Sequence, residues 1–152
     1  RVTLEPNSCA VHFRGTDFHQ WNPDSILSSQ YYLNAIEEVS DSVNSFYIFT
    51  DDRTLKSYQD VKKYLSDKKI SYVEGENTPN RLNFINDFAI LSQCDILISS
   101  PSTFCICAGF IGKHKKIIHS KKWVKGRVDR EDGFWVGLHN GGNQDYSAWK
   151  YF

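Results

Sequence analysis

Short apolar runs rich in β-branched residues alternate along the chain with longer stretches in which apolar residues recur at helical spacing. The five predicted strands span residues 8–13, 46–49, 70–73, 96–99 and 116–119. The four predicted helices span residues 29–40, 54–66, 86–94 and 102–111. Strands that are apolar throughout are typical of a parallel sheet covered on both faces. The pattern therefore predicts an α/β, Rossmann-like three-layer domain with a parallel sheet.

The stretch from residue 120 onward does not follow this alternation. Residues 121–132 are strongly charged, and residues 133–149 are rich in Gly, Asn and aromatic residues. Three interpretations remain open for this segment: a loop that covers a ligand, a surface that packs on another domain, or ordinary irregular structure. We treat residues 120–152 as a C-terminal extension of one domain that spans residues 1–152.

Composition narrows the class of protein. The chain has 152 residues, 40% hydrophobic and 24% charged, which is the balance of a globular domain with one core. Lys+Arg and Asp+Glu number 18 each, so no excess of basic charge favours nucleic acid as a partner. No apolar run approaches the roughly 18 residues that a membrane span needs. Because the chain begins at Arg1 and contains no Met, we expect it to be part of a longer protein.

The four cysteines give no sign of a metal site. Cys9, Cys94, Cys105 and Cys107 form no CxxC pair, and no His lies at zinc-finger spacing from them. Cys105 and Cys107 are two positions apart in a predicted helix and should point to different faces. We expect all four to be small buried hydrophobic residues.

Polar residues collect where three of the predicted strands end. In an open parallel sheet, ligands bind beyond the carboxyl ends of the strands, where the N-termini of the following helices also point. We therefore expect these three clusters to meet at one edge. They comprise Arg14, Gly15, Thr16 and Asp17 after the first strand, Thr50, Asp51 and Asp52 after the second, and Ser99, Ser100, Pro101, Ser102 and Thr103 after the fourth.

The cluster after the fourth strand has the composition of a helix start. Ser100 suits the N-cap, Pro101 the first helical position, and Ser102 and Thr103 add hydroxyl groups to the first turn. Backbone N–H groups and the helix dipole make such a turn an anion site suited to a diphosphate. The alternative is that these residues only cap a buried helix.

The cluster after the first strand offers a permanent positive charge. Arg14 has a planar fork that can bind two phosphate oxygens, and His12 points to the same side of the strand two residues earlier. Asp17 is placed to hold the arginine. A simple surface Arg–Asp pair is the alternative interpretation.

Asp51 and Asp52 allow two interpretations. A carboxylate pair after an apolar strand can hold a divalent ion on a nucleotide diphosphate. Alternatively, an Asx turn can cap the helix that begins near Thr54. Motifs for other functions are absent from the sequence: there is no GxGxxG, no GxxxxGK[ST] and no GxSxG.

In order along the chain, these segments resemble a known family. VHFRGTDF (residues 11–18) resembles the H-x-R-R-[GT]-D motif of the superfamily of α1,2-, core α1,6- and protein-O-fucosyltransferases. YIFTDDRTL (residues 47–55) is similar to its strand-then-TDD segment, and residues 86–111 look like its D-x-x-x-L-S stretch, serine turn and helix. The resemblance implies one half of a GT-B glycosyltransferase, namely the C-terminal domain that binds GDP-fucose without a metal or other cofactor.

Carried over by position, the resemblance assigns the site. Arg14 would contact the β-phosphate and favour departure of GDP, which makes it the catalytic residue, and Asp87 would accept the guanine N–H groups. Gly15 replaces the second arginine of the family motif, which could weaken binding or change the donor sugar. The donor-binding residues implied by the resemblance and the clusters are His12, Arg14, Asp17, Asp51, Asp52, Asp87, Ser100, Ser102 and Thr103.

Three functions follow as hypotheses. The first is transfer with inversion from a GDP-sugar, most simply GDP-fucose, to a glycan or glycoprotein acceptor. In that case an N-terminal domain of the same protein would complete the enzyme, and this chain alone would not transfer sugar. The second is a metal-dependent transferase that uses Asp51 and Asp52 as its ion site. The third is a Rossmann-like binding module without catalysis.

Overall fold

The computed structural model describes residues 3–21, 23–76, 81–120 and 149–151. The strands are β1 (Ser8–Phe13), β2 (Ser45–Thr50), β3 (Tyr72–Glu74), β4 (Ile96–Ile98), β5 (Lys116–His119) and β6 (Trp149–Tyr151). The helices are α1 (Phe18–Trp21), α2 (Ser29–Val39), α3 (Lys56–Asp67), α4 (Arg81–Gln93) and α5 (Thr103–Ile111), with short 3₁₀ turns at Pro23–Ser25 and Ser40–Ser42. Within the described residues, no helix has both the length and the apolar character that a membrane span requires.

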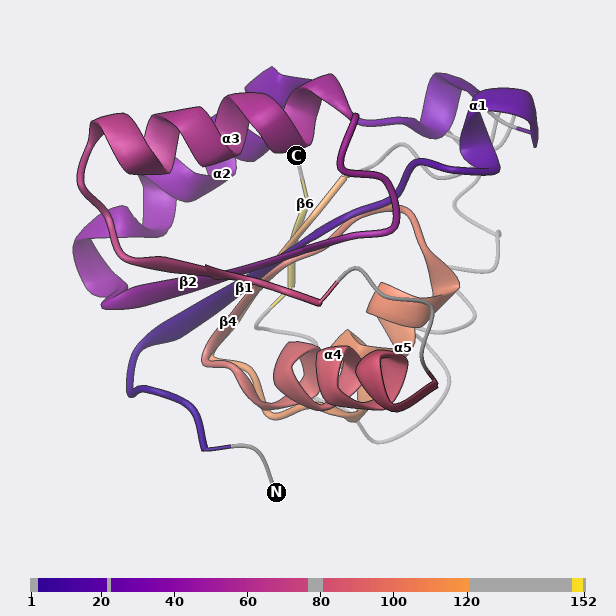
Figure 1. Cartoon of the computed structure of the whole chain (residues 1–152). Coiled ribbons are helices and arrows are strands. Elements are labelled where there is room, and N and C mark those ends of the chain that lie inside the picture. Colours follow the sequence, from indigo (N-terminus) through magenta and orange to yellow (C-terminus); the bar gives the residue numbers. More distant parts are fainter. Residues whose placement is uncertain (1–2, 22, 77–80, 121–148, 152) are drawn as a thin grey trace.

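The strands form one parallel sheet in the order β3-β2-β1-β4-β5-β6 (Figure 1). Every neighbouring pair in this order is parallel. The chain builds outward from β1 to β3, then returns to the other side of β1 to start β4. The order of the strands therefore reverses between β1 and β4, and in open α/β sheets this is where ligands bind. The predicted Rossmann-like α/β domain is confirmed.

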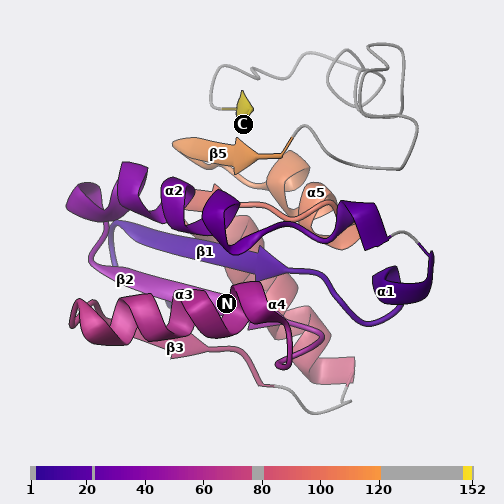
Figure 2. The same cartoon turned by 90° about the horizontal axis from the view of Figure 1, so that it is seen from above.

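Helices cover both faces of the sheet, so the domain has three layers. In Figure 1, α2 and α3 lie above the sheet, and α4 and α5 lie below it; Figure 2 shows the same arrangement from above. Side chains of β1 alternate between the two faces: Cys9, Val11 and Phe13 join the core under α2 and α3, whereas Ala10 joins the core over α4 and α5.

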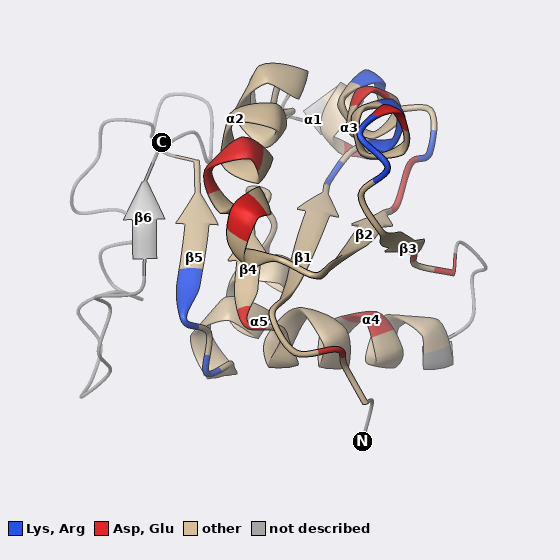
Figure 3. Cartoon of the chain, turned by 90° about the vertical axis from the view of Figure 1, so that its left-hand side faces the viewer, with Lys and Arg blue, Asp and Glu red and all other residues tan. Residues whose placement is uncertain are grey.

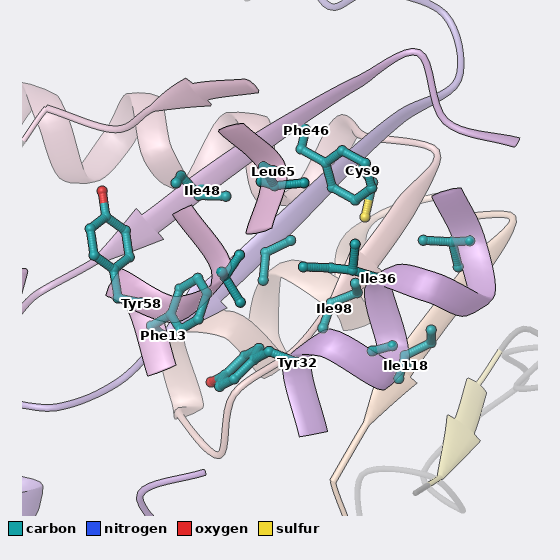
Figure 4. Close-up of a cluster of buried hydrophobic side chains, with 14 of the residues drawn as sticks. Cys9, Phe13, Tyr32, Ile36, Phe46, Ile48, Tyr58, Leu65, Ile98 and Ile118 are labelled. Atoms are coloured by element: carbon teal, nitrogen blue, oxygen red, sulfur yellow. The ribbon is translucent and has the colours of Figure 1, made fainter. Parts of the chain in front are cut away.

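The core under α2 and α3 contains large, fully buried side chains (Figure 4). The ring of Phe13 lies 4.2 Å from that of Tyr32 and 5.4 Å, edge-on, from that of Tyr58, measured between ring centroids. Tyr58 and Leu65, spaced at helical intervals in the sequence, are both buried on the inner face of α3. The helical period that predicted this helix is confirmed.

Several elements differ from the sequence-based expectation. Helix α4 begins at Arg81, five residues before the predicted start at residue 86. Arg81 and Leu82 favour helix by intrinsic propensity, but a prediction anchored on an apolar run does not register them. The short elements α1 and β6 have too few residues to show a period. The predictions for residues 121–148 lie outside the described residues.

The prediction that all four cysteines are buried is wrong for one of them. Cys9, Cys94 and Cys105 are buried, whereas Cys107 is exposed. Cys105 and Cys107 do point to different faces of α5, because two positions along a helix correspond to roughly 200° of rotation. Cys107 falls on the outer face.

Candidate functional site

The three polar clusters meet, as predicted, at the carboxyl edge of the sheet. They line a cavity of about 460 Å³, which we call the main cavity, together with side chains of α4. Its lining residues are His12, Arg14, Thr16, Phe49, Thr50, Asp51, Glu76, Asn83, Phe84, Asp87, Ser102 and Phe104. A cavity of this size is within the range of small-molecule sites.

His12 and Ser100 join the two strands at the point where the strand order reverses. The Nδ1 atom of His12, at the end of β1, is hydrogen-bonded to the Oγ of Ser100, in the turn after β4, at 2.6 Å. Both residues are buried. Burial lowers the pKa of His12 to about 4, although the charge of Asp51 opposes this effect. His12 is therefore a neutral imidazole at neutral pH.

Arg14 is held in place by two carboxylates from different parts of the chain. Its Nη1 donates to Asp51, and its Nη2 donates to Oδ1 of Asp17 at 2.6 Å. Its guanidinium carbon also lies 5.3 Å from the centre of the Phe18 ring. The predicted pairing with Asp17 is confirmed, but the pair is not an isolated surface contact, because Asp51 binds the same guanidinium at the edge of the main cavity.

Asp51 organises the loop that follows β1. Its Oδ1 accepts a hydrogen bond from the backbone N–H of Gly15 at 2.8 Å, and its Oδ2 accepts one from the Thr16 hydroxyl at 2.7 Å. With the bond from Arg14, this carboxylate receives three donors from one short segment. Asp51 thus ties the end of β2 to the loop that carries Arg14 and fixes the direction of the guanidinium.

Gly15 lies where no side chain fits without movement. A Cβ atom at this position would be 2.8 Å from Cδ1 of Leu55 and 2.9 Å from Cβ of Asp52. Leu55 is itself part of the core under α2 and α3. The glycine at the position of the family's second arginine therefore has a local packing reason in this chain.

Asp52 has other partners than Asp51. Its Oδ1 accepts hydrogen bonds from the backbone N–H of Thr54 at 2.9 Å and from the Thr54 hydroxyl at 2.6 Å. The hydroxyl bond is the main cause of a lowered pKa of Asp52. Asp52 thus forms the Asx turn of the alternative interpretation, but it does not cap the helix, because α3 begins at Lys56 and its N-cap, Leu55, makes no side-chain capping bond. Asp51 lines a cavity of about 460 Å³, and Asp52 is not part of its described lining.

The two carboxylates have different hydrogen-bond partners. Asp51 faces Arg14, Gly15 and Thr16, whereas Asp52 faces Thr54 and His19, whose Nε2 lies 3.3 Å from it. Among the described residues, no group of three or more His, Cys, Asp or Glu is arranged to hold a metal ion.

The turn before α5 differs in register from the prediction. Helix α5 begins at Thr103, and its N-cap is Ser102, not Ser100. The Ser100 hydroxyl is engaged with His12 instead, and Pro101 precedes the cap. In the described structure Ser102 makes no side-chain capping bond, so its hydroxyl does not occupy the N–H groups of the first turn. Ser102 lines the main cavity, whereas Thr103 is exposed and lies outside its described lining.

Asp87 lies in the middle of α4 and not at the start of a helix, where the sequence had placed it. It nevertheless faces the site. Burial, followed by the negative charge of Glu76, raises the pKa of Asp87 to about 6. Its carboxylate thus sits where water solvates it poorly, and a donor from a ligand would be favourable.

Asp87 also lines a second, adjoining cavity of about 300 Å³, which we call the side cavity. The two cavities share Phe49, Glu76, Asn83 and Asp87. The described lining of the side cavity includes Glu74, Glu76 and Asp87 but no Lys, Arg or His. In Figure 3, a basic segment follows β1 and acidic segments follow β2 and β3, and a further basic segment comes after the acidic one that follows β2. Arg14 is thus the Lys or Arg in the described lining of the main cavity, whereas the side cavity toward α4 is lined by carboxylates, with Arg53 bound to the Gly75 carbonyl beside it at 2.8 Å.

Five residues that line the main cavity were missed by reasoning from the sequence: Phe49, Glu76, Asn83, Phe84 and Phe104. Asn83 and Phe84 precede the predicted start of α4, so no element placed them near the edge of the sheet. Phe104 was read only as part of an apolar helix, yet its ring packs 5.8 Å from that of His12. A correct start for α4 would have brought Asn83 and Phe84 into the site.

No protein-family model, curated protein or solved structure matches the chain. The fold itself, with its parallel order and its cleft at the reversal between β1 and β4, is that of a Rossmann-like α/β domain.

Proposed function

We propose that this chain is the donor-binding domain of an inverting glycosyltransferase that uses a GDP-sugar, with GDP-fucose as the first candidate. The observation that carries the proposal is the meeting of Arg14, His12 and the helix cap Ser102 in one cavity where the strand order reverses, with His12 hydrogen-bonded to Ser100 behind it. Together with the ordered resemblance to fucosyltransferases, this favours a nucleoside diphosphate as ligand.

The diphosphate would lie between Arg14 and the first turn of α5. A guanidinium has five N–H donors, and the bonds from Nη1 to Asp51 and from Nη2 to Asp17 use two of them. Three donors remain for phosphate oxygens while the carboxylates keep the fork oriented. The helix start adds backbone donors on the other side. A preoriented fork loses little freedom when a ligand binds, which favours affinity.

The base would lie toward Asp87. The Watson–Crick edge of guanine offers two adjacent N–H groups, and a carboxylate can accept both; adenine and uracil do not offer that pair. The acidic end of the cleft repels phosphate and so favours the orientation with the base at α4. The polarity of the cleft thus matches a ligand that is anionic at one end and rich in donors at the other.

In the proposed reaction, an acceptor hydroxyl attacks the anomeric carbon as the bond to the β-phosphate oxygen breaks. The sugar inverts, the electron pair of the broken bond goes to the departing diphosphate, and the hydroxyl proton is lost to a base outside this domain. Arg14 and the α5 turn stabilise the charge that develops on the leaving group. The acceptor, a glycan or glycoprotein, would bind across a cleft completed by another domain.

The metal-dependent alternative has less support, since Asp52 is turned toward Thr54. Thermal unfolding with GDP, UDP, ADP or CDP, each with and without EDTA, tests the proposal against it. We expect GDP to stabilise the chain most, by about 2.7 kcal/mol at 100 times its dissociation constant, with or without EDTA. Equal shifts from all four nucleotides, or a shift that requires Mg²⁺ or Mn²⁺, would contradict the proposal. No shift from any nucleotide would favour a binding module of another kind.

A further inference from the structure

Phe84 is a large apolar side chain that water reaches at the mouth of the cleft. It is 58% exposed, yet it lines the main cavity beside His12 and Arg14. Its neighbour Ile85 is 63% exposed and belongs to the described lining of neither cavity. The two adjacent residues of α4 are thus alike in exposure and differ in their relation to the cleft.

The position of Phe84 on α4 relates it to Asp87. Residues three apart on a helix are neighbours on its surface, with Cβ atoms roughly 5–6 Å apart. Phe84 therefore places an aromatic side chain next to a carboxylate that borders both cavities. Asn83, which is buried, adds an amide to the lining of both cavities. A flat ring bearing N–H groups at its edge would fit this combination: the edge meets the carboxylate, and the face meets the phenyl ring.

We propose that Phe84 is the stacking platform for the nucleobase and a specificity-determining residue of the site. This inference rests on the proposed function, because it takes a nucleoside diphosphate as the ligand. Base–aromatic stacking depends on the planar face of the base, and its loss weakens binding about 5- to 150-fold. An exposed phenyl ring becomes buried only when ligand binds, so its contribution goes to affinity and not to folding.

The test compares the wild-type chain with Phe84→Ala, Phe84→Leu, Phe84→Trp and the matched control Ile85→Ala. Each is titrated by calorimetry with GDP and with inorganic pyrophosphate, which lacks the base. We expect Phe84→Ala and Phe84→Leu to bind GDP about 5- to 150-fold more weakly, with pyrophosphate affinity unchanged. Phe84→Trp should retain GDP affinity, and Ile85→Ala should match the wild type with both ligands.

Several outcomes would overturn the inference. If Phe84→Ala binds GDP as the wild type does, Phe84 does not stack on the base, and the proposed function stands without it. If Ile85→Ala loses as much affinity, the exposed residues act as an apolar patch and not as a base platform. Equal losses for GDP and pyrophosphate would indicate a change in the fold of the cleft. If the wild-type chain binds pyrophosphate as tightly as it binds GDP, the base contributes nothing to affinity. That result would refute both the inference and the guanine part of the proposed function.

Discussion

The hydrophobic cores on the two faces of the sheet differ in size. Under α2 and α3, the core is made of large side chains such as Phe13, Tyr32 and Leu65, which are almost fully buried. Over α4 and α5, the core is smaller and includes Ala10 and Ala108. Burial of large apolar side chains is a main source of folding stability. We therefore expect substitutions in the core under α2 and α3 to act mainly on stability, and substitutions in the main cavity to act mainly on ligand binding.

The alternation of β1 produces this division. Phe13 points into the large core, whereas its neighbour His12 points to the side of α5, where its ring packs against Phe104. The last residues of the same strand therefore serve both faces. A change on the α2/α3 face should alter stability with little effect on ligand affinity, and a change on the other face should do the opposite.

The largest expected effect is on the α2/α3 face. Leu65 is fully buried between α3 and the sheet, so Leu65→Ala should lower the free energy of unfolding by about 2–5 kcal/mol through lost burial and a residual cavity. Urea unfolding measures this. The control is Ile85→Ala on α4, which is exposed and should change stability by at most about 0.5 kcal/mol. GDP affinity of the folded Leu65→Ala chain should equal that of the wild type; a loss comparable to that of a cleft mutant would contradict the division between the faces.

The next effect concerns Arg14. We expect Arg14→Lys to impair GDP binding almost as much as Arg14→Ala, because lysine keeps the charge but cannot make two parallel bonds to a diphosphate. A hydrogen bond to a charged group contributes about 1.5–3 kcal/mol, which corresponds to roughly 10- to 150-fold in affinity. Calorimetric titration of the three proteins with GDP measures the loss.

Lys63→Ala is the matched control for Arg14. Lys63 is an exposed cation on α3 that pairs with Asp67 at 2.5 Å, away from the cleft. It should bind GDP as the wild type does. If both Arg14 variants bind GDP normally and lose at most about 1 kcal/mol of stability, Arg14 is only a structural ion pair. Full affinity in Arg14→Lys alone would reduce its role to simple charge.

A smaller effect should appear in the pH dependence of the free energy of unfolding, through the titration of Asp87. A carboxyl group whose pKa is raised to about 6 on folding binds its proton more tightly in the folded chain than in the unfolded one. Its contribution to stability is therefore largest at low pH and falls as pH rises from about 4 to about 6. At pH 7.5 the ionised group destabilises the unliganded chain, so Asp87→Asn should be more stable than the wild type there and no more stable below pH 4.

The same substitution should weaken GDP binding at pH 7.5 by about 10-fold, since an amide cannot accept both guanine N–H groups as a carboxylate does. Wild-type affinity should increase from pH 5 to pH 7.5 as Asp87 ionises, and Asp87→Asn should lose that part of the dependence. Because terminal phosphates also titrate near pH 6, the difference between the two proteins is the quantity to measure. Parallel pH profiles for the two proteins would remove Asp87 from the base site.

The sequence predicted the parts of the molecule that depend on repeated patterns. Both β1 and β5 have the predicted bounds, and the convergence of Arg14, Asp51 and Ser102 followed from the rule that parallel strands end at one edge. The residue that caps a helix within a polar turn could not be predicted, because several neighbouring residues there can each serve as the N-cap. Ser100 looked like a cap by composition, but its hydroxyl bonds to His12, 88 positions away along the chain.

The hydrogen-bond partners of charged residues could not be predicted from the sequence either. Asp51 and Asp52 are adjacent and chemically identical, yet the fold gives them separate tasks. Neither composition nor spacing distinguishes them, since the difference arises from which side of the loop faces Thr54. Phe84 was missed for a related reason: its role depends on where α4 begins, and helix starts without an apolar run are poorly marked.

The smallest expected effect follows from this separation. Asp52→Asn keeps a side-chain oxygen that can accept the hydrogen bonds from Thr54, so the Asx turn should persist and stability should change by at most about 1 kcal/mol. GDP affinity should stay within about twofold of the wild type, a difference of roughly 0.4 kcal/mol.

Asp51→Asn is the informative partner of that variant. It removes the charge that orients Arg14 and receives donors from Gly15 and Thr16, so it should weaken GDP binding even though the neighbouring substitution does not. Calorimetry with GDP, with and without added Mg²⁺, compares the two variants. If the pair instead holds a divalent ion, both substitutions should abolish a Mg²⁺-dependent component of binding to a similar extent. Unequal effects that persist in EDTA therefore favour positioning of Arg14 by Asp51 over a shared ion site, because only an orienting role separates two adjacent carboxylates.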